Sequence, residues 1–287
     1  MRRTTTWLMA LCALLVLQRA SMSALNGIPR GAGVVVVNPA TAEQLDLLGP
    51  VWYYSYDYEG EALSGHRRVL LIRPHFDSSE VRRALRQNPG AWWLVGNEPN
   101  DPFQDNLSPT TYAAFYNRVE TLAWDVDRSA SLVPAGIANA DWRWAQAFLD
   151  SYEQQYGEEP RIAAWNIHNY ILEPDRDQLD VSEFQARVIA FRKWMSAAGE
   201  DDKPLLLTEF GVLFGTGLGG RPPVDPMQSR AFVSQVVEWL AVSDYVQGWS
   251  WFANNTGGQF NGDLYLDSGE LSDFGESYRD ALSAIAK

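Results

Sequence analysis

Residues 91–100 have the sequence Ala-Trp-Trp-Leu-Val-Gly-Asn-Glu-Pro-Asn. Apolar side chains follow one another without interruption up to Val95, and Gly96 and Pro99 mark the end of a regular element. An unbroken apolar run of this length is typical of a strand in a parallel sheet, because both faces of such a sheet are covered. The segment therefore predicts a buried parallel strand over residues 91–96 that ends in a polar loop.

Seven other segments share this pattern. They lie at residues 33–37, 51–56, 69–73, 131–135, 163–168, 205–209 and 246–251. Helical patterns occur between most of them, and such alternation is typical of βαβ units. Eight strands in a chain of 287 residues predict an α/β fold, namely a single (β/α)8 TIM barrel, since such barrels commonly use about 250 residues as one domain. A doubly wound sheet is the alternative, and the lack of a glycine-rich phosphate loop after the first strand disfavours it.

The predicted helices are marked by apolar side chains at spacings of three and four residues. The clearest begins at Ser108-Pro109, which supplies an N-cap and a proline in the first helical turn. Further stripes cover residues 184–195 and 232–240, and Ser272 is the expected N-cap of a final helix. The second barrel helix is the exception. Only residues 57–68, with two glycines, separate the second and third strands, so we expect this helix to be short or absent.

Residues 1–24 have the pattern of a secretory signal peptide: two arginines, an 11-residue apolar run at 7–17, and small residues before position 24. A membrane anchor is the alternative, but a spanning helix needs about 20 apolar residues. We therefore expect a signal peptide over 1–24, the (β/α)8 domain over 25–287, and a secreted, periplasmic or extracellular location. Cleavage would also remove Cys12, the one cysteine, so neither disulfides nor Cys-bound zinc are expected.

The charge of the chain limits its partners. It has 23 Lys+Arg against 36 Asp+Glu, a net charge of -13. That balance argues against nucleic acid and against anionic membrane surfaces, which both require clustered positive charge. The three histidines have no metal-ligand spacing, so no metal and no cofactor are expected. We expect a monomer, with neither nucleic acid nor a membrane as its partner.

Two glutamates stand where apolar strands end. Glu98 follows the fourth strand, and Glu209 ends the seventh in Leu205-Leu-Leu-Thr-Glu209-Phe-Gly211. In a barrel both would reach the carboxyl face, where active sites lie. A carboxylate after such a run is costly to bury unless it is paired or used. Two carboxylates from different strands are what glycoside hydrolysis needs, one as a proton donor and one as a nucleophile.

The Asn-Glu-Pro and Thr-Glu-Phe-Gly motifs resemble those of clan A glycoside hydrolases, which are retaining (β/α)8 enzymes. The resemblance spans residues 33 to about 285. It implies that Glu98 is the acid/base, that Glu209 is the nucleophile, and that Asn97 binds the sugar 2-hydroxyl. Within this clan, the small size of the chain and its Gly-Asn-Glu-Pro-Asn motif are most similar to the glycosyl-hydrolase catalytic-core group around family 128, the β-1,3-glucanases. That similarity implies hydrolysis of a β-linked glycan, β-glucan among the options, by double displacement. An oligosaccharide or polysaccharide substrate is then the expected partner.

The same resemblance implies four further substrate-binding residues. His168 and Tyr170 resemble the His-x-Tyr of the sixth strand, whose tyrosine lies beside the nucleophile. Trp251 resembles the strand-eight tryptophan that forms the floor under the sugar, and Arg73 stands where an arginine near the nucleophile is expected. We also expect two at most of the four tyrosines at positions 53, 54, 56 and 58 to line the cleft, because alternate strand residues face opposite sides.

Each assignment has an alternative. Glu98 is also suited to capping its loop, and Glu209 to a structural ion pair. His168 and Tyr170 are equally suited to packing at the barrel rim. At the level of the whole protein, a secreted carbohydrate-binding barrel without catalysis and a transglycosidase with the same residues are the alternatives to a hydrolase. The loop 214–226 is expected to border the cleft, and the sequon at Asn254 is either fortuitous or a substrate contact.

Overall fold

The computed structural model describes residues 30–220 and 222–286, so the predicted signal peptide lies outside the described residues. Within them, eight strands form one sheet in the order β5-β4-β3-β2-β1-β8-β7-β6, and each neighbouring pair in this order is parallel. The strands are β1 (Gly31–Val35), β2 (Trp52–Tyr54), β3 (Arg67–Ile72), β4 (Trp92–Asn97), β5 (Ser131–Gly136), β6 (Trp165–Asn169), β7 (Leu205–Phe210) and β8 (Val246–Trp251). A parallel bridge between Ile137 and Ile167 joins the two ends of this order, so the barrel is nearly closed. The (β/α)8 prediction is confirmed.

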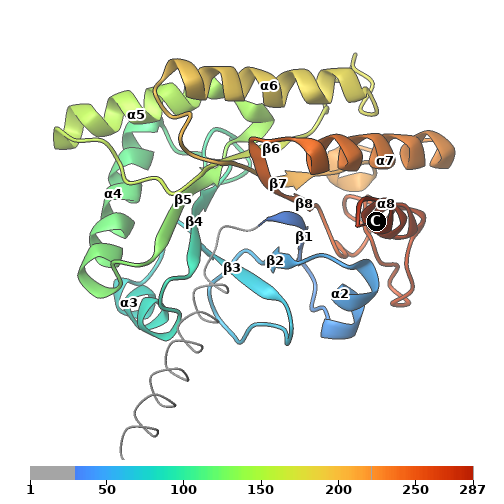
Figure 1. Ribbon diagram of the computed structural model, residues 1–287, viewed down its shortest axis with the longest axis horizontal. Coiled ribbons are helices and arrows are strands. Elements are labelled where there is room, and N and C mark those ends of the chain that lie inside the picture. Colours follow the sequence, from blue (N-terminus) through green and yellow to red (C-terminus); the bar gives the residue numbers. More distant parts are fainter. Residues whose placement is uncertain (1–29, 221, 287) are drawn as a thin grey trace, which may run out of the picture.

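Helices surround the sheet (Figure 1). They are α2 (Ala42–Leu48), α3 (Ser78–Gln87), α4 (Pro109–Val126), α5 (Trp142–Tyr156), α6 (Val181–Ala197), α7 (Pro226–Val242) and α8 (Asp273–Ile285), with the 3-10 turns η1 (Ala138–Ala140) and η2 (Thr216–Leu218). As predicted, no helix connects β2 to β3; this connection, residues 55–66, is entirely within the described chain. None of the helices described is both long enough and apolar enough to cross a membrane.

The predicted helix starts are confirmed. The Ser108 hydroxyl accepts a hydrogen bond from the backbone N–H of Thr111, and Pro109 occupies the first position of α4. The Ser272 hydroxyl accepts from the N–H of Gly275 at the start of α8. Each cap satisfies a backbone donor that has no partner within the helix.

Buried side chains form two separate clusters because alternate strand residues face opposite sides. Leu70 and Ile72 of β3 belong to the cluster that includes the helix side chains, between the sheet and its helices. Val69 and Leu71 belong to the second cluster, which contains strand and loop residues and fills the barrel. The orientation of each strand therefore determines which residues at its carboxyl end can reach a site above the barrel.

Candidate active site

A cleft of about 630 Å³ opens where the strands end. Its lining includes Asn97 at the end of β4 and Glu98 directly after it, Tyr170 after β6 and Glu209 of β7. Gly217 and Leu218 also line it, which confirms that the loop 214–226 borders the cleft. The volume lies within the range of ordinary small-ligand sites, about 300–1,000 Å³.

The backbone of Glu98 has a conformation that L residues rarely adopt. Its φ angle is 42°, and it is followed by Pro99. Hydrogen bonds hold it on both sides: the Glu98 N–H donates to the carbonyl of Gly136, and the Asp101 N–H donates to the carbonyl of Glu98. A side chain held in left-handed backbone geometry costs about 1–3 kcal/mol, and such strain is concentrated at functional sites.

Glu209 faces the barrel interior because β7 departs from regular alternation. The pairing of β7 with β8 shifts register between Leu207 and Phe210. Phe210 packs outward against Phe184 of α6, whereas Thr208 and Glu209 both make contacts inside the barrel. A bulge of this kind re-aims a side chain at a strand end, and here it brings the second carboxylate into the cleft.

Three tyrosines donate hydrogen bonds to the Glu209 carboxylate. The hydroxyls of Tyr54 and Tyr56 donate to Oε1 over 2.7 and 2.6 Å, and that of Tyr170 donates to Oε2 over 2.9 Å. Burial, and then the charge of Glu209, raise the pKa of all three hydroxyls well above the usual value. They are therefore neutral donors at neutral pH, and together they stabilise an ionised Glu209.

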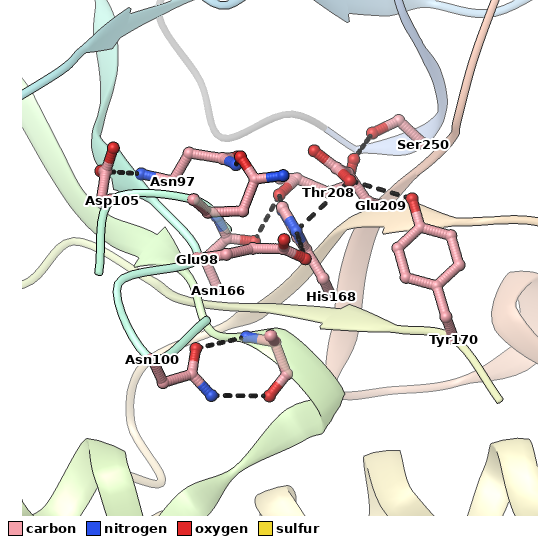
Figure 2. A network of polar contacts seen from close by, with 12 residues as sticks. Asn97, Glu98, Asn100, Asp105, Asn166, His168, Tyr170, Thr208, Glu209 and Ser250 are labelled. Atoms are coloured by element: carbon pink, nitrogen blue, oxygen red, sulfur yellow. Dashed lines mark hydrogen bonds and ion pairs between the residues drawn. The ribbon is translucent and has the colours of Figure 1, made fainter. Parts of the chain in front are cut away.

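His168 lies between the two glutamates (Figure 2). Its Nδ1 is 2.8 Å from Oε1 of Glu98 and 3.4 Å from Oε2 of Glu209. Gly136 leaves room for the ring, since a Cβ at that position would lie 1.9 Å from Nε2. The imidazole thus links the two carboxylates that were predicted to be catalytic.

The hydrogen-bond network determines which nitrogen of His168 carries a hydrogen. Asn166 donates through Nδ2 to the carbonyl of Pro134, so its Oδ1 accepts from the Thr208 hydroxyl over 2.8 Å. Thr208 has then donated its one hydrogen, and its oxygen accepts from Nε2–H of His168 over 3.0 Å. It follows that the short Nδ1···Oε1 contact contains one proton shared between His168 and Glu98.

Burial is the largest cause that raises the pKa of Glu98; the hydrogen bond and charge of His168 oppose it, and the charge of Glu209 adds to it. The net pKa is raised. Burial lowers the pKa of His168, but the charges of Glu209 and Glu98 outweigh it and raise that pKa as well. Two groups that hold their protons to higher pH than usual, beside an ionised carboxylate, are suited to general acid catalysis.

The same three side chains are a possible metal-binding group. Among the residues described, only Glu98, His168 and Glu209 bring three ligand atoms within 4.8 Å of one another. Tyr54 and Tyr56 already fill the two lone pairs of Oε1 of Glu209, and Nδ1 of His168 is engaged with Glu98. The arrangement is one of proton donors around carboxylates, which is suited to proton transfer.

Arg73 lines the cleft but has another partner than the one expected. Within the described part of the chain, its guanidinium forms an ion pair with Asp105 over 2.8 Å and none with Glu209. Asp105 also accepts from the backbone N–H of Asn97 over 2.7 Å. Through Asp105, Arg73 thus holds the Asn97-Glu98 turn in place. Tyrosine hydroxyls occupy the position beside Glu209 where an arginine was expected.

The prediction that Trp251 forms the floor under the sugar is wrong. Trp251 is 0% exposed, packs against Phe274 and Tyr278 of α8, and donates through Nε1 to the carbonyl of Gly262. Strand alternation turns it toward the helices. The next residue, Phe252, faces inward and lines the cleft.

Asn254 is not a substrate contact. Its side chain is buried, accepts from the N–H of Val37 and donates to the carbonyl of Asn38. These bonds tie the segment after β8 to the end of β1. The sequon there is fortuitous, since a buried amide with both ends bonded is closed to a glycan.

Sequence reasoning missed several members of the network. It treats Tyr54 and Tyr56 as an aromatic lining, whereas both contact the nucleophile candidate. Thr208 and Asn166 lie next to predicted site residues, and their polar side chains within apolar strands were a usable signal. Asp105 carried no such signal, because it belongs to a loop of polar residues.

Comparison with known proteins is consistent with this geometry. The family described as "Glycosyl hydrolase catalytic core" matches residues 33–278, most of the chain. No curated protein matches the sequence. Among solved structures, a GH128 (subgroup II) endo-β-1,3-glucanase from Sorangium cellulosum is similar, with a TM-score of 0.65 and 21% identity over 88% of this chain and 98% of that chain.

Two other solved structures have the same architecture. A GH128 (subgroup I) endo-β-1,3-glucanase from Amycolatopsis mediterranei, in complex with laminaritriose, has a TM-score of 0.67 and 19% identity over 88% of this chain and 99% of that one. A GH128 (subgroup III) curdlan-specific exo-β-1,3-glucanase from Blastomyces gilchristii, in complex with glucose, has a TM-score of 0.65 and 20% identity over the same shares. At these identities the likeness establishes the fold.

Proposed function

This chain belongs to the glycosyl hydrolase catalytic-core family and is a glycoside hydrolase, and we propose that it cleaves β-1,3-glucan by a retaining double displacement with Glu98 as the acid/base and Glu209 as the nucleophile. The observation that carries the proposal is the position of His168 between these two carboxylates in one cleft. The β-1,3 linkage is supported by the structural relatives, which are described as β-1,3-glucanases of both endo and exo type.

In the first step, the proton shared by Glu98 and His168 passes from Glu98 to the glycosidic oxygen. The bond between that oxygen and the anomeric carbon breaks, and an oxygen of Glu209 forms a bond to the anomeric carbon. The hydroxyls of Tyr54, Tyr56 and Tyr170 hold the Glu209 carboxylate in place before the attack. His168 supports this step because the contact between its Nδ1 and Oε1 of Glu98 holds the carboxyl group in position.

In the second step, the ionised Glu98 removes a proton from a water molecule that attacks the anomeric carbon. The bond to Glu209 breaks and the sugar is released with its original configuration. We assign to Asn97 the binding of the 2-hydroxyl of the reacting sugar. Its backbone N–H donates to Asp105 and its side-chain amide to Gln104, and these bonds support that assignment.

The spacing of the two carboxylates favours retention over inversion. One oxygen of Glu98 and one of Glu209 lie within 4.8 Å of each other. Retaining enzymes place these groups about 5–5.5 Å apart, and inverting enzymes about 6.5–9.5 Å apart to leave room for a water. This short spacing supports the retaining mechanism that we propose.

We also propose that the enzyme is exported, on the basis of the signal-like segment 1–24. Determining the N-terminal residue of the protein recovered outside the cytoplasm tests this. An intact N-terminus beginning at Met1 in the cytoplasmic fraction would contradict it.

The primary test is reducing-sugar release from β-1,3-, β-1,4- and mixed-linkage glucans, mannan and xylan. We expect release from β-1,3-glucan by the wild type and none by Glu209→Gln or Glu98→Gln. Proton NMR of the first product should show the β anomer; an initial α anomer would overturn retention. Products longer than the substrate would indicate transfer to sugar instead of water.

A further inference from the structure

Phe103 is the most exposed large hydrophobic side chain among the residues described, with 91% of its surface accessible. It lines the cleft, on the loop that follows Glu98. Single exposed apolar residues are common on protein surfaces. This one differs because it stands at the rim of the cavity that contains both carboxylates.

The loop that carries Phe103 is anchored firmly. Asn100 is bonded at both ends of its amide to the backbone of Ala138, donating to its carbonyl over 3.0 Å and accepting from its N–H over 2.9 Å (Figure 2). Asp101 accepts from the N–H of Phe103 over 2.7 Å, and Leu107 donates to the carbonyl of Pro99 over 2.8 Å. The exposure of the ring is therefore a property of an ordered loop.

Polar side chains belong to the same cleft lining as Phe103. Asp101, Gln104 and Asn139 all line it. Asn139 is held with a φ angle of 57° in η1, another left-handed residue at the cleft. An apolar plane beside amide and carboxylate groups matches a pyranose ring, which has an apolar face of C–H groups and an edge of hydroxyls.

We propose that Phe103 is a platform on which a glucosyl unit of the substrate chain stacks, beyond the unit that reacts. The inference rests on the proposed function, since it assigns a subsite of the same cleft. A short stretch of hydrogen-bonded backbone joins Phe103 to Glu98. A sugar stacked on Phe103 therefore has a fixed position relative to the glycosidic bond that Glu98 protonates. Because these hydrogen bonds already order the backbone of the loop, ordering of the loop does not oppose binding.

The test is calorimetric titration of laminarihexaose into the inactive Glu209→Gln enzyme, with and without Phe103→Ala. We expect Phe103→Ala to weaken binding about tenfold, because it removes an aromatic ring and the area that the sugar would bury, and Phe103→Trp to retain it. In the active enzyme, Phe103→Ala should raise KM and leave kcat nearly unchanged, because the ring does not touch the reacting atoms. Met227→Ala, which removes another highly exposed apolar side chain outside the cleft lining, is the matched control.

The outcomes separate the two proposals. Equal affinity of Glu209→Gln with and without Phe103→Ala would overturn the platform and leave the proposed function intact. Failure of Glu209→Gln to bind laminarihexaose, with binding of cellohexaose, would overturn the β-1,3 assignment; the effect of Phe103→Ala on cellohexaose then decides the platform. Binding of neither oligosaccharide would contradict both.

Discussion

The hydroxyl of Tyr56 lies 2.6 Å from Oε1 of Glu209, and the same oxygen accepts a second hydroxyl hydrogen from Tyr54. A buried carboxylate with two neutral donors on one oxygen is stabilised in its charged form without a neighbouring arginine. This distinguishes the site from the expected arrangement, in which Arg73 lies near the nucleophile. The charge of Glu209 is balanced by hydrogen bonds, and the imidazole of His168 is the nearest group that can carry positive charge.

Tyr56→Phe removes one of these donors and leaves the ring in place. We expect kcat to fall about ten- to a hundredfold, since hydrogen bonds to charged groups contribute about 1.5–3 kcal/mol. Steady-state kinetics on soluble β-1,3-glucan measure the effect. Tyr58→Phe is the control, because Tyr58 packs against Trp93 and does not line the cleft. A Tyr56→Phe enzyme with wild-type kcat would show that Glu209 does not depend on this contact.

The second prediction concerns the pH at which activity is lost. Glu98 must be protonated to act as the acid, so activity falls as the pH rises through its pKa. The hydrogen bond and charge of His168 both lower that pKa. Replacing His168 with Asn removes them, so the alkaline limb of the kcat/KM profile should move to higher pH, with a lower maximum rate.

His66→Asn is the matched control for the pH experiment, since His66 pairs with Asp46 and does not line the cleft. Its profile should coincide with that of the wild type. A limb that moves to lower pH in His168→Asn would mean that neutral His168 accepts the proton from Glu98 and raises its pKa. That result would reverse the assigned direction of the His168–Glu98 interaction.

The strands were predictable because burial on both faces produces unbroken apolar runs, and all eight predicted runs overlap strands of the structure. The direction of side chains at strand ends was harder to predict. Trp251 and Phe252 are adjacent aromatic residues, and only their alternation relative to the barrel decides which one reaches the cleft. For β7, the register shift that turns Glu209 inward leaves no mark in the pattern of residue types.

The contacts among the site residues could not be predicted from the sequence, because they also depend on how the strands are arranged in the closed barrel. Tyr54 and Tyr56 are two residues apart in the predicted strand 51–56, so both were expected on one face. The sequence could not show that both would contact Glu209. Their contact with Glu209 joins residues more than 150 positions apart and depends on closure of the barrel. Helices α2 and α3 do carry start signals in the sequence: Thr41 and Gln44 form a capping box at α2, and Asp77 caps α3.

The third prediction follows from the backbone of Glu98. Glycine adopts positive φ without the steric cost that a Cβ brings. Glu98→Gly should therefore be more stable than Glu98→Ala by about 1 kcal/mol, although both variants lose activity. Urea unfolding of the two variants measures the difference.

Ser234, an exposed residue within α7, provides the opposite case. There Gly should be less stable than Ala by about 1 kcal/mol. If Ala were more stable than Gly at both positions, the left-handed conformation at Glu98 would carry no strain.

The last prediction separates Trp251 from Phe252. Trp251 is enclosed between β8 and α8, and its Nε1 hydrogen bond ends at Gly262. Trp251→Phe should lower the free energy of unfolding by about 1–3 kcal/mol, through poorer packing and a carbonyl without its donor, and leave KM unchanged.

Phe252 borders the cleft and packs edge to face on Tyr170. Phe252→Leu should therefore raise KM severalfold, since its ring would touch the bound substrate. Unfolding curves and KM values for the two variants are the measurement, and a raised KM in Trp251→Phe without any loss of stability would restore Trp251 to the substrate-binding surface.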